Sequence, residues 1–266
     1  MKNEFNPDHV IINVSGGKDS TALMIYALKN FPKEKLVCVH AKIDIDWKET
    51  IGVVEAQCAH FDLPLVVVTS QHKDGSEKGF LSKLVSDRID RKTKAVKQQK
   101  FPDMKNRWCT GELKMSPIHK YVRTLRGNIL SLLGERREES SQRSKLTDWR
   151  PNEKLSKAGR NVVDFSPILD LKESEVWAQI KESKAPVHPC YEKFGVSRAS
   201  CAICIFSSNK DIVAAAKHAP EIVKKYIQAE RQIDHTFRYK PATKTKPAQK
   251  QTIESILKAE GITFEV

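Results

Sequence analysis

The stretch VIINVSGGKDS (residues 10–20) joins an apolar run to a turn of small and charged residues. The run 10–14 predicts a short buried strand, and the residues after the turn, 21–29, have helical character. In an α/β protein such a turn follows the carboxyl end of a parallel strand, which is the end at which ligands bind. We therefore expect the turn to form part of a binding site.

The turn has the composition of an anion-binding loop. Its two glycines let backbone N–H groups approach an anion closely, and the N-terminus of the following helix favours negative charge. The lysine would neutralise phosphate charge, the aspartate would hold Mg²⁺ or its water shell, and the two serines would donate hydrogen bonds. An ordinary serine–glycine turn that ends in a helix cap is the alternative. The residues concerned are Ser15, Gly16, Gly17, Lys18, Asp19 and Ser20.

Strand and helix patterns alternate beyond this loop. Strand patterns cover 36–39, 65–68 and 129–133, and helical patterns cover 51–61, 117–125 and 221–233. The alternation predicts an α/β fold with a parallel sheet, helices on both faces and a helical C-terminal region. We expect three parts: an α/β domain at 1–180, a cysteine-containing helical region at 181–239, and a basic linker with a terminal helix at 240–266.

Three charged or polar segments lack a clear pattern of this kind. The basic stretch 88–100 follows an amphipathic helix around 80–85 and predicts either a solvated helix or a mobile flap. The charged segment 135–157 predicts a loop over the site. The segment 240–250 is rich in lysine, threonine and proline and predicts a linker.

The charge balance points to an anionic partner. The 266 residues include 46 lysines and arginines against 33 acidic residues, a net charge of +13. This charge favours nucleic acid as a partner, and a solvated basic surface is the alternative. The N-terminal residues lack the pattern of a signal peptide, and no apolar run reaches membrane-spanning length. We expect a soluble cytoplasmic protein with no membrane partner.

Several further blocks resemble the phosphoadenosine phosphosulfate (PAPS) reductase branch of the PP-loop ATP pyrophosphatases. The blocks are the loop 15–20, His40-Ala41, Trp47 to Thr50, Arg107 to Thr110, Leu113-Lys114, Gly134 to Ser140 with Arg143, Pro167-Ile168 and Val176-Trp177. The resemblance implies an adenine nucleotide α-hydrolase-like, Rossmann-like fold over the first 180 residues. It also implies an enzyme that splits ATP into AMP and pyrophosphate with Mg²⁺ and adenylates an acceptor oxygen.

The resemblance assigns roles to residues outside the loop. Arg136 joins Lys18 and Asp19 as a catalytic residue, and His40, Gly134 and Arg143 join the loop as ATP-binding residues. The arginines follow a predicted strand end, where they would meet phosphates or an adenylated intermediate. A solvated loop with salt bridges to the neighbouring glutamates is the alternative.

One departure from the PAPS reductase pattern bears on function. PAPS reductases attack the sulfonate sulfur with a C-terminal cysteine in a Glu-Cys-Gly-like setting, whereas this sequence ends in GITFEV (residues 261–266) and its last cysteine is Cys204. The loop also retains Lys18 and Asp19 in the form expected for ATP. Sulfonucleotide reduction is therefore disfavoured.

Four of the six cysteines predict a metal site. Cys201 and Cys204 form a CxxC pair, and Cys190 and Cys109 precede it. Four thiolates suit a 4Fe–4S cluster or Zn²⁺, and a metal-free dithiol is the further alternative. Resemblance to DNA sulfur-modification ATP pyrophosphatases favours the cluster, although Cys109 would also fit a nucleotide pocket. The other two cysteines, Cys38 and Cys58, are expected in the core.

The leading hypothesis is a DNA phosphorothioation enzyme that uses ATP to activate a backbone phosphate oxygen for replacement by sulfur. The expected partners are DNA, a cysteine desulfurase and other DNA-modification proteins, with a homodimer as an open alternative to a monomer. Three rival functions are a PAPS reductase-like sulfonucleotide enzyme, an RNA-thiolating enzyme, and a non-catalytic regulator that binds nucleotide and DNA.

Overall fold

The computed structural model describes residues 5–89, 93–199, 201–240 and 247–265. The chain forms two compact units. Unit 1 comprises Met1–Lys42, Glu49–Val68 and Met115–Pro189, and unit 2 comprises Ile43–Lys48, Thr69–Lys114 and Cys190–Val266. The boundaries of these units differ from the expected domain boundaries at 180 and 239. The expected division into three domains stays a prediction.

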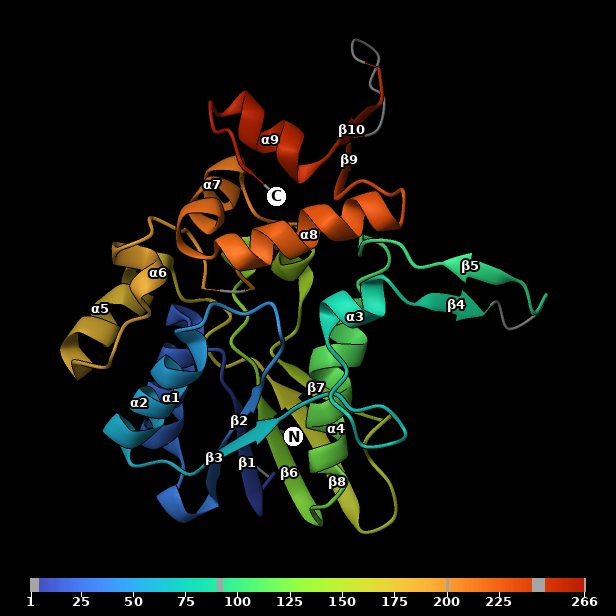
Figure 1. The fold of residues 1–266 in the computed structure, drawn as a ribbon. Helices are drawn as coiled ribbons and strands as arrows, with labels where there is room; N and C mark the ends of the chain where they lie inside the picture. The colour runs from blue at the N-terminus through green and yellow to red at the C-terminus, as the bar shows by residue number, and fades with distance from the viewer. Residues whose placement is uncertain (1–4, 90–92, 200, 241–246, 266) are drawn as a thin grey trace. The chain divides into compact units, whose positions relative to one another are not determined.

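Unit 1 is built on a six-stranded sheet (Figure 1). In spatial order the strands are β3 (Leu65–Val68), β2 (Leu36–Ala41), β1 (His9–Asn13), β6 (Gly127–Leu132), β8 (Arg160–Phe165) and β7 (Trp149–Pro151). The first five strands are parallel to one another, and the edge strand β7 is antiparallel to β8. The predicted parallel sheet is confirmed.

Helices cover both faces of this sheet, as predicted. Because side chains alternate along a strand, Val10 and Ile12 face one side of β1 and Ile11 faces the other. The first side packs against α1 (Lys18–Asn30) and α2 (Thr50–Phe61), and the second packs against α4 (Ser116–Val122). A further helix, α5 (Glu173–Ser183), packs on α1 through an apolar contact that includes Ala22, Val176 and Ile180.

The strand order reverses between β1 and β6. From β1 the chain continues through β2 to β3 on one side, whereas β6 and β8 lie on the other side. In open α/β sheets the crevice at such a reversal, beyond the carboxyl ends of the strands, is the usual ligand site. The loop 14–17 after β1 and the loop 133–136 after β6 leave the sheet at this point.

Unit 2 contains the helical C-terminal region. Its helices are α3 (Phe80–Leu84), α6 (Pro189–Glu192, beginning at the last residue of unit 1), α7 (Asn209–His218), α8 (Pro220–Gln232) and α9 (Ile253–Ala259), and a π-helical segment, η3 (Cys109–Met115), continues into unit 1. In its core Phe80 stacks between Trp108 and Tyr226, with ring centroids 5.0 and 5.4 Å apart. The Tyr226 hydroxyl donates a hydrogen bond of 3.1 Å to the carbonyl of Ile203.

Three segments differ from their predicted form. The helix alternative for 88–100 is wrong, because β4 (Asp87–Ile89) pairs antiparallel with β5 (Val96–Gln98); residues 90–92 lie outside the described ones. The segment 135–157 is not all loop: it includes the short 3-10 helices η4 (Arg137–Glu139) and η5 (Arg143–Lys145) and the edge strand β7. The linker 240–250 contributes β10 (Gln249–Gln251), paired with β9 (Arg238–Lys240), and its residues 241–246 lie outside the described ones. In each of these segments, pairing with a neighbouring stretch of the chain creates a short strand despite the polar local composition.

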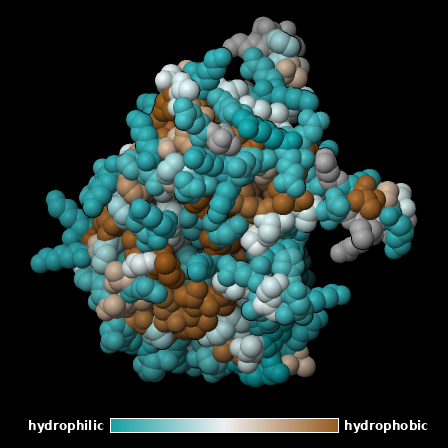
Figure 2. Space-filling model, viewed as in Figure 1, coloured by the Kyte–Doolittle hydropathy of each residue, from teal (hydrophilic) through white to brown (hydrophobic). Residues whose placement is uncertain are grey.

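The visible surface is mostly hydrophilic (Figure 2). This agrees with a charged-residue content of 30%. One exposed large hydrophobic residue, Val67, lies on the edge strand β3. None of the helices in the described ranges has the length and apolar character needed to cross a lipid bilayer.

Candidate functional site

The loop between β1 and α1 requires a glycine at its second position. Gly16 has φ +75°, in the left-handed region that residues with a Cβ rarely adopt. A Cβ there would also lie 3.3 Å from Val54 Cγ2. Gly17 is the N-cap of α1, and because glycine has no side chain it makes no side-chain cap hydrogen bond. The first-turn N–H groups of a helix have no partner within the helix, so the start of α1 presents backbone donors and positive potential.

Hydroxyl groups hold this loop in shape. The Ser20 hydroxyl donates to the Gly17 carbonyl at 2.8 Å and accepts from the Ser15 N–H at 3.2 Å. Thr21 Oγ1 donates to the same carbonyl at 3.1 Å. The serines predicted to bind phosphate thus brace the loop itself. Their contact with phosphate stays a prediction.

The loop after β6 passes close to the start of α1. A Cβ on Gly134 would lie 3.3 Å from the carbonyl carbon and oxygen of Asp19, so a side chain there would push the two segments apart. Asn13 Nδ2 also donates to the carbonyl of Leu132 at 2.9 Å, which ties the ends of β1 and β6 together. The close approach explains why a glycine stands at 134.

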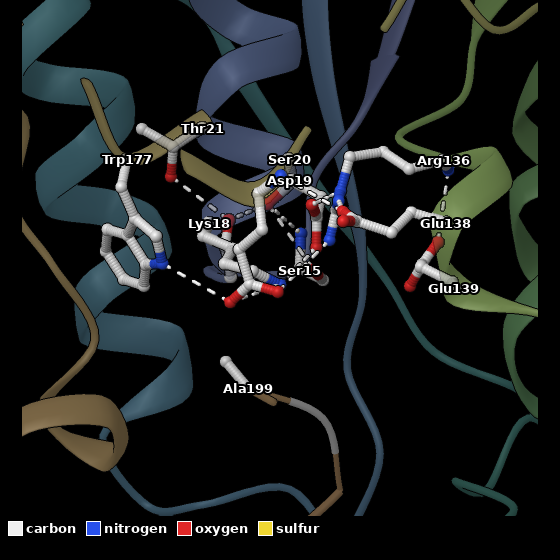
Figure 3. A network of polar contacts seen from close by, with 12 residues as sticks. Ser15, Lys18, Asp19, Ser20, Thr21, Arg136, Glu138, Glu139, Trp177 and Ala199 are labelled. Atoms are coloured by element: carbon white, nitrogen blue, oxygen red, sulfur yellow. Dashed lines mark hydrogen bonds and ion pairs between the residues drawn. The ribbon is translucent and has the colours of Figure 1, made fainter. Parts of the chain in front are cut away.

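Three predicted catalytic residues meet at this point (Figure 3). Lys18 Nζ donates to Asp19 Oδ2 at 3.0 Å, and Arg136 Nε donates to Asp19 Oδ1 at 2.6 Å. The cationic side chains are almost fully buried, with exposures of 3% for Lys18 and 2% for Arg136. The structure therefore brings together two buried cations and a bridging carboxylate beside the N-terminus of α1.

Two glutamates join this group. Glu138 Oε2 lies 2.5 Å from Arg136 Nη1. The Glu173 carboxylate lies 3.6 Å from Arg136 Nη2 and 4.0 Å from Lys18 Nζ. Sequence reasoning missed Glu173, whose only local signal was its place in the first turn of a helix, and treated Glu138 as a salt-bridge alternative. The Arg136–Glu138 ion pair of that alternative is present, but Arg136 is buried rather than solvated.

The remaining arginines of this loop are also paired. Arg143 Nη1 donates to Glu139 Oε2, which also accepts the backbone N–H of Arg136 at 3.1 Å. Arg137 Nε donates to Asp170 Oδ1 at 2.6 Å. Arg143 thus supports the backbone of Arg136 through Glu139. Its direct contact with ATP stays a prediction.

Two histidines lie near the loop in buried positions. His40, at the end of β2, shares a hydrogen bond of 3.0 Å through Nδ1 with the carbonyl of Val14. His188 Nε2 and Thr50 Oγ1 are 3.2 Å apart, and burial lowers the pKa of His188. Gln57, which sequence reasoning also missed, donates to the carbonyls of Gly16 at 3.4 Å and Pro186 at 2.8 Å. These contacts fix the loop backbone from the α2 side, while the ATP role of His40 stays a prediction.

Three of the four predicted metal-ligand cysteines, Cys109, Cys201 and Cys204, lie near Lys114 in unit 2. The pKa of Lys114 is raised by the nearby acidic groups, of which Cys201 has the largest effect. Asp46, Cys204 and Cys109 contribute in the same direction. Burial raises the pKa of Cys201 to about 12. Cys201 and Cys204 also line a pocket with Arg198 and Phe206. We call Cys109, Cys201 and Cys204 the three-thiol cluster.

The three-thiol cluster has the right donor chemistry for a soft metal or an iron–sulfur centre, because thiolates are the preferred ligands of both. Its geometry is not that of a formed site: among the described residues, no group of three or more His, Cys, Asp or Glu side chains is arranged to hold a metal ion. Cys190 is fully buried in the unit 2 core, and its carbonyl accepts the Val196 N–H at 2.9 Å. Cys38 and Cys58 are buried core residues, as predicted.

Comparison with known proteins identifies the family. Residues 9–207 match the phosphoadenosine phosphosulfate reductase domain. The chain belongs to this family. The match contains the loop 15–20, the loop 133–136 and all six cysteines. The observed sheet agrees with the adenine nucleotide α-hydrolase-like fold that the sequence predicted.

Three proteins similar to this member of the PAPS reductase domain family are described as uncharacterized. An uncharacterized protein of Methanocaldococcus jannaschii is 27% identical over 80% of this chain and 45% of the relative. A second uncharacterized protein of that organism is 24% identical over 82% of this chain and 40% of the relative. The chain therefore spans less than half the length of both. An uncharacterized 37.8 kDa protein of Escherichia phage 186 is 23% identical over 83% of this chain and 74% of the relative.

Solved structures with detectable similarity include two enzymes. Phosphoadenylyl-sulfate reductase from Candida auris, as a phosphate complex, is 15% identical with a TM-score of 0.48, covering 74% of this chain and 82% of that chain. The U34-tRNA thiolase NcsA from Methanococcus maripaludis, with its 4Fe–4S cluster, is 14% identical with a TM-score of 0.46, covering 88% of this chain and 75% of that chain. At these values we infer no function from either similarity.

Proposed function

We propose that this PAPS reductase domain protein binds ATP at residues 15–20 and splits it between the α and β phosphates. The observation that carries the proposal is the pair of buried cations, Lys18 and Arg136, joined by Asp19 at the reversal of strand order. Polyphosphate is the common ligand that matches a helix N-terminus flanked by fixed positive charges. The retained lysine and aspartate favour a triphosphate over a sulfonucleotide.

Each residue has a distinct task in this proposal. The N–H groups after Gly17 bind phosphate oxygens, and Lys18 and Arg136 compensate the charge that builds up on the leaving pyrophosphate. The carboxylate of Asp19 suits Mg²⁺, which prefers oxygen ligands and is usually bound by one or two carboxylates together with phosphates. Bound there, Mg²⁺ would neutralise phosphate charge. The buried positions of the two cations hold them in place before ATP arrives.

The reaction needs positioning more than covalent chemistry by the protein. An acceptor oxygen attacks the α phosphorus, the bond to the bridging oxygen breaks, and pyrophosphate leaves with the electron pair. The products are an adenylated acceptor and pyrophosphate. A sulfide-level sulfur nucleophile then attacks the activated phosphorus, forms a P–S bond and displaces AMP with its electron pair; sulfur delivered as a persulfide also requires a thiol reductant that cleaves the S–S bond.

For the acceptor, we propose a backbone phosphate oxygen of DNA, so that sulfur insertion produces a phosphorothioate. The net charge of +13 supports a nucleic-acid acceptor, and the family description supports sulfur chemistry. Sulfur would come from a cysteine desulfurase, acting with other DNA-modification proteins in the cytoplasm. A homodimer belongs to the same proposal.

The three-thiol cluster is the proposed metal centre, with Cys190 as the proposed fourth ligand. A 4Fe–4S cluster bound there would supply electron-transfer or sulfur-binding chemistry, and Zn²⁺ would supply a structural tie. The three thiols of the cluster already share one environment in unit 2. A metal centre requires these sulfur atoms to rearrange toward one point.

The family description also favours a second candidate, reduction of a sulfonucleotide. That reaction releases sulfite and consumes a thiol reductant, but it releases no pyrophosphate. An RNA-thiolating enzyme would share ATP cleavage and differ in its acceptor. A regulator that only binds nucleotide and DNA would release neither sulfite nor pyrophosphate.

The test is release of pyrophosphate and AMP from ATP and Mg²⁺, with anaerobically purified protein and with or without DNA. We expect release that DNA stimulates and that Asp19→Ala abolishes while the fold is kept. The matched control is Asp170→Ala, which removes an exposed aspartate paired with Arg137 rather than with Arg136. Unaltered turnover in Asp19→Ala contradicts the loop assignment. Sulfite release in a parallel assay with a sulfonucleotide and a thiol reductant, without pyrophosphate release from ATP, supports the reductase.

A further inference from the structure

The cations beside the loop 15–20 are matched by carboxylates, with no excess of positive charge among the described residues of this site. The buried cations Lys18 and Arg136 face three carboxylates, those of Asp19, Glu138 and Glu173. Lys172 is a further cation near Glu138. A site that bound free anions by charge alone would carry an excess of cations. The presence of three carboxylates beside these cations therefore requires an explanation.

The three carboxylates differ in how they are held. Asp19 lies in the first turn of α1, contacts both cations within 3.0 Å and is 19% exposed. Glu138 and Glu173 are 54% and 51% exposed. A half-exposed carboxylate can rotate into water at little cost. The buried cations cannot lose their carboxylate partners without a large penalty unless another anion replaces those partners.

A backbone contact and a side-chain contact hold the two glutamates near the cations. Glu138 Oε2 accepts the backbone N–H of Glu173 at 3.0 Å, at the start of α5. Glu173 Oε1 accepts the indole N–H of Trp177 at 3.4 Å, one turn further along the same helix. Both carboxylates are thus held beside Lys18 and Arg136.

We propose that Glu138 and Glu173 determine which anions the loop accepts, by acting as internal anions that a polyphosphate must displace. This inference rests on the proposed nucleotide site, and it concerns binding rather than cleavage. A metal-free anion meets carboxylates that compete for the same cations and repel it. A polyphosphate that carries Mg²⁺ brings positive charge of its own, which compensates the glutamates. The loop thus discriminates against free phosphate and sulfate in favour of metal-bound polyphosphate.

Calorimetric titration with inorganic pyrophosphate tests this proposal without any need for turnover. In a chelator at low ionic strength, we expect Glu173→Gln and Glu138→Gln each to bind pyrophosphate roughly tenfold more tightly than the parent protein, since each removes one competing charge. With excess Mg²⁺ the gain should fall below about threefold. Glutamine keeps an oxygen that can accept the N–H contacts described above, so the fold should survive.

Two charge-matched controls lie in the same unit. Glu182→Gln removes a charge further along α5, and Asp170→Asn removes the partner of Arg137. Neither should change pyrophosphate affinity by more than about twofold, because exposed charges at a distance are screened. Equal thermal midpoints in all four variants would show that the folds are comparable.

Either of two results overturns the inference. Unchanged pyrophosphate affinity in both glutamate variants would show that the carboxylates do not compete with phosphate. Weaker binding in both, with midpoints retained, would show that they assist it. Failure of ATP cleavage, with the expected pyrophosphate affinities intact, would instead count against the proposed function alone.

Discussion

Arg136 donates its Nε hydrogen bond to Oδ1 of Asp19 at 2.6 Å, across 117 positions of sequence. The pair joins the loop after β6 to the first turn of α1, and it lies where the strand order of the sheet reverses. The same aspartate accepts from Lys18, so one carboxylate sets the positions of both buried cations. Loss of any member of this group should alter the others.

The first prediction concerns Arg136 itself. Arg136→Lys keeps the charge but loses the planar fork that contacts Asp19 and Glu138 through different nitrogens. We expect pyrophosphate release to fall by about a hundredfold. Arg137→Lys is the control, since Arg137 pairs with Asp170 and should retain activity within about twofold. Comparable losses in the two variants would contradict a special role for Arg136.

The second prediction concerns the close approach of Gly134 to α1. Gly134→Ala places a Cβ 3.3 Å from the Asp19 carbonyl, and backbone atoms must shift to admit it. We expect a loss of about 1–3 kcal/mol in the free energy of unfolding and weaker nucleotide binding. Gly52→Ala, in α2, meets no atom within 4 Å and should be neutral or stabilising. Denaturant unfolding and nucleotide titration of both variants provide the check, and equal stability would refute the packing argument.

The third prediction concerns the cysteines. Anaerobically purified protein should show broad visible absorbance, and Cys109→Ser, Cys201→Ser and Cys204→Ser should each reduce it together with the iron content. Cys58→Ala, a substitution in the core of unit 1, should retain the colour even if it lowers stability. Cys190→Ser tests the proposed fourth ligand. A colourless protein that contains zinc would exclude iron at this cluster.

The fourth prediction concerns a buried carboxyl in unit 2. Glu230 accepts the backbone N–H groups of Phe237 at 2.6 Å and Ile253 at 2.9 Å, and burial raises its pKa from 4.5 to about 7. Between these two pKa values the folded protein holds a proton that the unfolded chain releases. Stability should therefore fall as pH rises from 4.5 to 7 and level off above that range.

Unfolding at pH 5 and at pH 7.5 would measure this contribution. The change in unfolding free energy should be larger in the parent protein than in Glu230→Gln by about 2 kcal/mol. Glutamine does not titrate, so its own destabilising effect should be similar at both pH values. An identical pH dependence in the two proteins would show that Glu230 titrates normally.

Much of the fold could be predicted because its signals are local. Apolar runs and helical periodicity placed β1, β2, β3 and β6 within a few residues of their observed bounds, and their alternation with helices predicted the parallel sheet. The short hairpins of β4 with β5 and β9 with β10 were not predicted. Strands of three residues in polar sequence have too little pattern to detect, and pairing with another segment creates them.

The candidate site also has a part that could be predicted from local sequence and a part that could not. Residues 15–20 were recognisable because glycine, lysine, aspartate and serine are consecutive there, and the backbone freedom that the loop requires is a property of Gly16 itself. The grouping of Asp19, Arg136, Glu138 and Glu173 arises only when β1 and β6 lie side by side and α5 packs on α1. Local chemistry can be read from neighbouring residues, whereas the balance of charge at the loop depends on contacts between segments more than a hundred positions apart, which the folded chain creates.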